Sequence, residues 1–134
     1  MKGPRDSALG LLEKASHDLV AAKATVAVGE AFDTVCFHAQ QAAEKSLKAL
    51  LAVKNVEYPK RHDIGELVSL AKAHFPEVAG LEDALFSLTP YAVEMRYDDE
   101  MYPDLREARH ALAAARKIHA LARRIIAQRK RRTQ

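Results

Sequence analysis

The polar segment from Arg96 to Asp104 carries the side chains best suited to ligand chemistry. The guanidinium group of Arg96 can clamp a phosphate through two hydrogen bonds. The rings of Tyr97 and Tyr102 can stack on a base, and their hydroxyls can accept a phosphoryl or nucleotidyl group. Alternatively, Arg96 only pairs with one of the carboxylates two or three positions away along the chain. The segment is our first candidate site, with Arg96 as its central residue.

A second polar group, made of Lys60, Arg61, His62 and Asp63, lies just before a predicted helix. The N-terminus of a helix attracts anions, so two cations and an imidazole there form a natural anion site. In the alternative interpretation, Asp63 caps the helix and the other three side chains are solvated. The sequence alone leaves both interpretations open.

Other chemistries find no support in the pattern. The six histidines show none of the His-x-x-x-His or His-Glu-x-x-His spacings of a zinc site, and no glycine-rich phosphate loop is present, so we expect no metal and no cofactor. The lone Cys36 lies in an apolar stripe, where a small buried hydrophobe is expected rather than a nucleophile. His38 is expected to make a partly buried polar contact. Four histidines are expected to be solvated: His17, His74, His110 and His119.

Composition and charge favour a single helical domain. Of the 134 residues 49% are hydrophobic, none is Trp, and Gly and Pro are few, which suits helices more than strands. The net charge of +3 is uneven, because residues 123–134 hold six basic and no acidic side chains. This basic end either binds RNA or another polyanion, or is a solvated helix end with a frayed tail.

No segment is suited to a membrane or to export. The longest stretches free of Asp, Glu, Lys and Arg, residues 34–43 and 84–93, have ten residues each. A membrane span needs about 20, and the N-terminus leads into no apolar core of the signal-peptide kind. A single cysteine excludes an intrachain disulfide and fits a reducing compartment. We therefore expect a soluble cytoplasmic protein with no membrane contact.

Apolar residues recur at spacings of three and four along most of the chain. They predict an all-α fold, an antiparallel up-and-down bundle of four main helices plus one or two short ones. The expected helices cover residues 8–26, 32–51, 64–75, 81–88, 90–97 and 103–128. The expected helix caps are Asp6 or Ser7, Asp63 and Thr89, and Gly29 is expected to end the first helix. Residues 1–128 are predicted to form the bundle, and residues 129–134 a basic C-terminal tail.

Three segments in this order resemble one known family. They are Phe37–Leu51, with its Gln-x-x-Glu-Lys-x-Leu-Lys string, Tyr58–Leu67, and Tyr91–Tyr97, which ends in an Arg-Tyr pair. The sequence is similar to the HEPN family, the higher eukaryotes and prokaryotes nucleotide-binding domain, in the prokaryotic type found beside minimal nucleotidyltransferases. The resemblance implies a bundle of four or five helices that forms a two-fold homodimer with one shared cleft. It also implies a nucleotide or RNA ligand and a nucleotidyltransferase partner, often as toxin and antitoxin.

The resemblance also assigns roles to residues. It implies that Arg96 contacts phosphate and that Tyr97 and Tyr102 stack or form hydrogen bonds. Two lysines of the second predicted helix would add positive charge to the groove, and one histidine would contribute if its loop folds toward them: Lys45, Lys48 and His62. Several branches of the family are metal-independent RNases, marked by an Arg followed four to six residues later by a His. This chain instead carries Tyr102 six residues after Arg96.

Three functions follow as hypotheses. In the first, the chain is a nucleotide- or RNA-binding partner of a minimal nucleotidyltransferase in a two-gene, toxin–antitoxin-like system. In the second, it is a divergent metal-independent RNase toxin in which Arg96 and Tyr102, or a histidine such as His62, act without the usual motif. In the third, it is a non-catalytic structural adaptor. The missing histidine favours the first, because RNA cleavage through the 2′-hydroxyl loses its usual acid–base agent.

Overall fold

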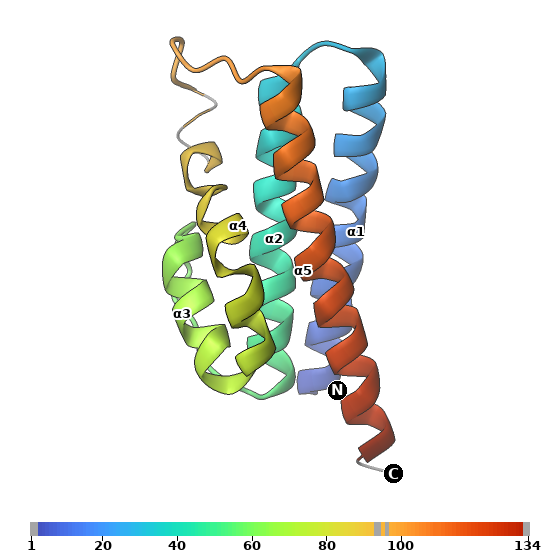
Figure 1. The fold of residues 1–134 in the computed structure, drawn as a ribbon. Coiled ribbons are helices and arrows are strands. Elements are labelled where there is room, and N and C mark those ends of the chain that lie inside the picture. Colours follow the sequence, from blue (N-terminus) through green and yellow to red (C-terminus); the bar gives the residue numbers. More distant parts are fainter. Residues whose placement is uncertain (1–2, 93–94, 96, 133–134) are drawn as a thin grey trace.

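The computed structural model describes residues 3–92, 95 and 97–132, and the regular structure of this part is helical (Figure 1). The elements in chain order are α1 (Pro4–Val28), α2 (Phe32–Val53), α3 (Ile64–His74), the 3-10 helix η1 (Pro76–Leu81), α4 (Glu82–Phe86), the 3-10 helix η2 (Thr89–Tyr91) and α5 (Leu105–Arg132). No strand occurs among the described residues. The predicted all-α class is confirmed.

The body of the molecule consists of α1, α2 and α5 packed side by side, while α3 covers a further side of α2 (Figure 1). Helices α1 and α2 run in opposite directions. The chain from α3 to η2 then returns to the end of the bundle where α2 begins, so that α5 again runs antiparallel to α1 (Figure 1). The up-and-down order holds, but its third member is a series of short helices rather than one long one.

Helix α2 is the most enclosed element, because α1, α3 and α5 all pack against it. The predicted apolar stripe is buried, with Val35 and Leu47 fully inaccessible. Three polar side chains of α2 are buried as well, namely Gln40, Glu44 and Ser46. The Ser46 hydroxyl donates a hydrogen bond to a carbonyl of its own helix. Gln40 and Glu44 must find other partners, because a buried amide or carboxylate without hydrogen bonds is costly.

Of the four predicted helix caps, Gly29 and Asp63 are confirmed, and the caps at Asp6 or Ser7 and at Thr89 are wrong. Gly29 ends α1 in the left-handed conformation, with φ at 85°. Asp63 caps α3 and accepts a hydrogen bond from the Glu66 backbone N–H at 3.2 Å. Helix α1, however, begins at Pro4 rather than near Ala8, because proline is pre-organised for the first helical position. Asp6 therefore lies inside the first turn and accepts from the Gly3 N–H, and neither Asp6 nor Ser7 is the cap.

The predicted helix over residues 90–97 is interrupted. Thr89–Tyr91 forms a single 3-10 turn, and Ala92 is extended with ψ at −178°. Met95 and Tyr97 have 3-10 geometry, and residues 93, 94 and 96 lie outside the described part of the chain. The Thr89 hydroxyl donates to the Phe86 carbonyl at 2.7 Å and does not cap a following helix. The helix predicted over 81–88 is shorter than expected, since α4 covers only Glu82–Phe86. Tertiary contacts with α2 and α5, rather than local propensity, hold these short pieces.

Helix α5 starts close to its predicted position and ends later. The Asp104 carboxylate accepts from the Glu107 N–H at 2.8 Å, while the Glu107 carboxylate accepts from the Asp104 N–H at 3.2 Å. This reciprocal pair is a capping box. At the other end α5 continues to Arg132, beyond the expected end near Gln128, because Arg and Lys favour helices and suit the last turn of a helix dipole. No helix in the described part is long and apolar enough to cross a membrane.

Candidate functional site

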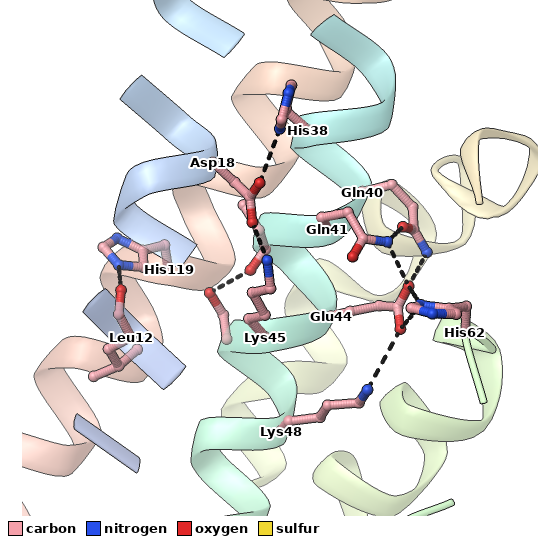
Figure 2. A network of polar contacts seen from close by, with 12 residues as sticks. Leu12, Asp18, His38, Gln40, Gln41, Glu44, Lys45, Lys48, His62 and His119 are labelled. Atoms are coloured by element: carbon pink, nitrogen blue, oxygen red, sulfur yellow. Dashed lines mark hydrogen bonds and ion pairs between the residues drawn. The ribbon is translucent and has the colours of Figure 1, made fainter. Parts of the chain in front are cut away.

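The buried carboxylate of Glu44 is the centre of a polar network on the side of α2 that faces the segment before α3 (Figure 2). Its side chain is only 1% exposed. The Gln40 amide donates to it at 2.5 Å, and the Gln41 amide lies 3.4 Å away. His62 arrives from outside the helix, with Nδ1 3.2 Å from both carboxylate oxygens. The ammonium group of Lys48 lies 3.8 Å from the Glu44 carboxylate and is the fourth polar group beside it.

This network fixes one histidine at the edge of a pocket. Because a carboxylate accepts, Nδ1 of His62 carries the proton, and the other ring nitrogen remains for a ligand. The pocket measures about 470 Å³. Seven residues line it: Gln40, Arg61, His62, Asp63, Ile64, Thr89 and Ala92. The Nδ1 edge of the His62 imidazole is held by Glu44. The His62 side chain is 45% exposed, so the rest of the ring is accessible to a ligand. From the sequence, a ligand role for His62 is expected only if its loop folds toward the groove.

Two predicted lysines have structural partners of their own. Lys48 stands over the Tyr58 ring at 5.7 Å as well as near Glu44. Lys45 points away from the pocket toward α1, where its ammonium lies 2.5 Å from the Asp18 carboxylate (Figure 2). The structure thus brings Lys48 and His62 together, and places Lys45 on another side of α2.

Asp18 and His38 form a second polar pair that sequence reasoning missed. The Asp18 side chain is 11% exposed and binds Nδ1 of His38 at 2.8 Å in addition to Lys45. His38 also lines a small pocket of about 220 Å³ with Asp33, Thr34, Phe37 and Met95. The expected partly buried polar contact of His38 is confirmed. Its partner was not predictable, because the contact depends on how α1 and α2 are aligned.

The structure describes only part of the segment from Arg96 to Asp104, which the sequence predicts as a ligand site. Arg96 lies outside the described residues. Tyr97 and Tyr102 are 84% and 76% exposed, so both rings are free to contact a ligand. Asp98 and Asp104 instead bind backbone N–H groups of their own segment. Ala92 lines the His62 pocket and Met95 lines the His38 pocket, so each histidine has one of these two residues beside it.

Two further expectations concern single titratable groups. Burial raises the pKa of the Cys36 thiol to about 12, and the nearby Glu107 carboxylate adds to the shift. The expectation of a small buried side chain is confirmed. His119 was expected to be solvated and is instead 8% exposed, with Nε2 donating to the Leu12 carbonyl at 3.1 Å. The correction has a simple cause, since α5 packs against both α1 and α2 and its buried face is wide. Among the described residues no cluster of His, Cys, Asp and Glu could hold a metal ion.

The chain thus forms an antiparallel helical bundle with a carboxylate-held histidine at a surface pocket. A family model of the HEPN domain matches residues 8–125, and the chain belongs to this family. It is similar to the crystal structure of TT1696 from Thermus thermophilus, with 31% identity, a TM-score of 0.72, and coverage of 87% of this chain and 96% of that one. It is also similar to ST0689, an archaeal HEPN homologue, with 25% identity, a TM-score of 0.71, and coverage of 94% and 99%. Among curated proteins no relative matches.

Proposed function

We propose that this HEPN protein is a nucleotide- or RNA-binding module that acts with a minimal nucleotidyltransferase in a two-gene, toxin–antitoxin-like system. The pocket at His62 is the observation that carries the proposal. Its volume suits a nucleotide-sized ligand. Its rim offers the Arg61 guanidinium, which donates to phosphate oxygens, and the His62 imidazole, whose Nε2 donates to one when the ring is protonated. The segment that leads to Arg96 borders the same space at Ala92.

Glu44 is the positioning residue of this site. It touches no solvent and orients His62 through the Nδ1 contact. A histidine whose ring is held in one orientation loses less freedom when it binds a ligand. Arg61 is held in a similar way, since its guanidinium pairs with Glu66 at 2.6 Å and retains further N–H donors. Tyr97 and Tyr102 would supply stacking surfaces from the neighbouring segment.

Calorimetric titration with AMP and UMP tests the site. We expect binding by the wild type and at least about a tenfold loss in His62→Ala and Arg96→Ala, the cost of about 1.4 kcal/mol for one lost charged contact. His17→Ala is the matched control, because His17 is an exposed histidine of α1. Glu44→Gln keeps the side-chain shape and is expected to weaken binding without unfolding the protein. Absence of wild-type binding, or an equal effect of His17→Ala, would reject the site.

The alternative function of a divergent metal-independent RNase has one observation in its favour. Two imidazoles are each held by an enclosed carboxylate, His62 by Glu44 and His38 by Asp18. Such an imidazole can take the proton of an RNA 2′-hydroxyl while the O2′–P bond forms and the P–O5′ bond breaks, and can return the proton to the leaving oxygen. Incubation with total RNA in a chelator distinguishes the two functions. Cleavage that disappears in His62→Ala or His38→Ala would favour the RNase.

We also propose that the protein is a homodimer in the cytoplasm, with one cleft shared between its two subunits, as the resemblance to the HEPN family implies. Light scattering is expected to give twice the chain mass, and a pulldown is expected to retain the nucleotidyltransferase encoded next to it. Retention of that partner by a protein that binds neither nucleotide nor RNA would instead favour the adaptor role.

A further inference from the structure

The exposed face of α5 has an unusual composition. Between Arg109 and Ala127 every exposed position holds a cation, a histidine or an alanine. The positions are Arg109, His110, Ala113, Arg116, Lys117, Ala120, Arg123, Arg124 and Ala127. None of them carries a large apolar side chain or a carboxylate. This surface, which we call the α5 basic face, lies outside the His62 pocket.

The Arg and Lys side chains of the α5 basic face, with His110, form two rows. One row contains Arg109, Arg116 and Arg123, and the second contains His110, Lys117 and Arg124, each with a spacing of seven residues. Seven residues rise about 10 Å along a helix and drift by only about 20° around it. Each row therefore extends over about 21 Å. The exposed alanines lie between them.

Within the described part of the chain, none of the five Arg and Lys side chains of the α5 basic face lies in an ion pair. Four cations elsewhere, Lys45, Lys48, Arg61 and Lys72, each pair with a carboxylate. One cause lies in the sequence, because the 27 residues after Glu107 hold nine basic side chains and no acidic one. An external anion or salt would reduce the repulsion among the five cations of the face.

Neighbouring elements add to the same surface. The guanidinium of Arg5, from α1, donates to the Ile126 carbonyl at 3.0 Å and lies beside Arg123 and Arg124 in a hollow of about 460 Å³. A second hollow of about 500 Å³ is lined by Lys117 and Arg124, together with Glu77 from η1. Ala120 and Arg124 border both hollows. The basic face is therefore recessed over its C-terminal half, and among the described residues that line the two hollows Glu77 is the only one with a carboxylate.

We propose that the α5 basic face binds the phosphodiester backbone of a single-stranded nucleic acid. Rows of basic side chains that follow a repeating spacing over about 21 Å suit a chain of phosphates, and small side chains between them allow the backbone to approach closely. A protein partner would need large apolar or aromatic anchors; the exposed positions between Arg109 and Ala127 carry none, and Leu9 of α1 is the exposed large apolar side chain that borders the hollow beside Arg123. The proposal does not depend on the His62 pocket, because the two surfaces share no residue.

Fluorescence anisotropy with a labelled oligouridylate of about 12 nucleotides tests the proposal in the full-length protein. We expect binding that weakens steeply with salt. The double variant Arg116→Gln/Arg123→Gln is expected to lower affinity at least about tenfold and to reduce the slope of log K against log salt by about 1.4, which is about 0.7 per lost contact. Lys14→Gln/Lys23→Gln removes the same charge from exposed positions of α1, and its slope is expected to equal that of the wild type.

Three further measurements decide between explanations. Equal losses in the two double variants would overturn the proposal, because net charge alone would then account for binding, and so would a failure to bind at about 50 mM salt. Poly-glutamate that competes as well as the oligouridylate at equal charge would also overturn it, in favour of an acidic protein. An oligothymidylate that binds with the same slope supports backbone recognition.

The basic face and the His62 pocket are tested separately. Arg116→Gln/Arg123→Gln is expected to retain AMP binding. His62→Ala is expected to lose AMP binding but to keep the salt slope of oligouridylate binding, so each proposal can fail without the other.

Discussion

At the scale of single residues, the chemistry of Cys36 is set by its place in α2. Burial raises the pKa of its thiol to about 12, so at pH 8 the thiolate that reacts with thiol reagents is scarce. We expect Ellman's reagent to label the native protein no faster than the protein unfolds. The same reagent in denaturant should label one thiol per chain at once. Rapid labelling of the native protein would show that Cys36 is accessible.

His119 gives the protein a defined pH dependence. Burial lowers the pKa of His119, although its contact with the Leu12 carbonyl acts in the opposite direction. The unfolded chain, with a pKa near 6.5, therefore binds a proton more readily than the folded one. Its contribution to stability is present above about pH 6.5 and is lost as the pH falls toward the lower folded pKa.

The variant His119→Gln isolates this effect. A glutamine amide can still donate to the Leu12 carbonyl but does not titrate. We expect the wild-type melting temperature to fall between pH 7 and pH 5 by more than that of the variant. His110→Gln is the control, since His110 is an exposed histidine of the same helix. Parallel pH profiles for wild type and His119→Gln would show that His119 is not the source.

At the scale of elements, Asp18 links α1 to α2 through the side chains of His38 and Lys45. Its carboxylate is nearly enclosed and contacts both His38 and Lys45. We expect Asp18→Ala to lower the free energy of unfolding by about 2 kcal/mol, because it leaves two partly buried donors without an acceptor. Glu13→Ala removes an exposed carboxylate of α1 that lies 4.0 Å from His17, and is expected to change stability by less than about 0.5 kcal/mol. Chemical denaturation measures both, and equal effects would contradict the role of Asp18.

The same elements show what the sequence predicts and where it fails. The spacing of apolar residues predicts α1, α2 and α5, because each has a long stripe that must be buried. It fails over residues 90–97, where Thr89 and Pro90 resemble a helix start but Ala92 is extended. Local signals there are overridden by packing against α2 and α5.

The candidate site was predictable only in part. His62 and Lys48 do meet at one network, but Glu44, which joins them, gave no local signal of burial. Its enclosure depends on the segment before α3 folding back onto α2. Asp18 and His38 are twenty residues apart and meet only through the alignment of two helices. The basic face of α5, by contrast, is visible as a repeat of seven once the buried positions of the helix are known.

At the scale of the whole molecule, charge divides the chain. Residues 1–107 hold all 18 carboxylates and 12 of the 21 basic side chains, while residues 108–134 hold the other nine. The core does not follow this division, since the buried positions of α5 reach to Ile126. The terminal part of α5 thus adds charge without adding core, and in Figure 1 it extends past the start of α1. We therefore expect this terminal part of α5 to contribute to anion binding but little to the stability of the fold.

A truncation after Gln128 tests this separation together with the predicted domain boundary. The shortened chain keeps Ile125 and Ile126 and is expected to lose less than about 1 kcal/mol of stability, the size of a helix-dipole term. Truncation after Ala122 also removes these two isoleucines and is expected to cost several kcal/mol. The first truncation removes four basic residues, so oligouridylate binding should weaken and its salt slope should become smaller while the melting curve stays in place. A large drop in stability on removing residues 129–134 would show instead that this basic end belongs to the folded domain.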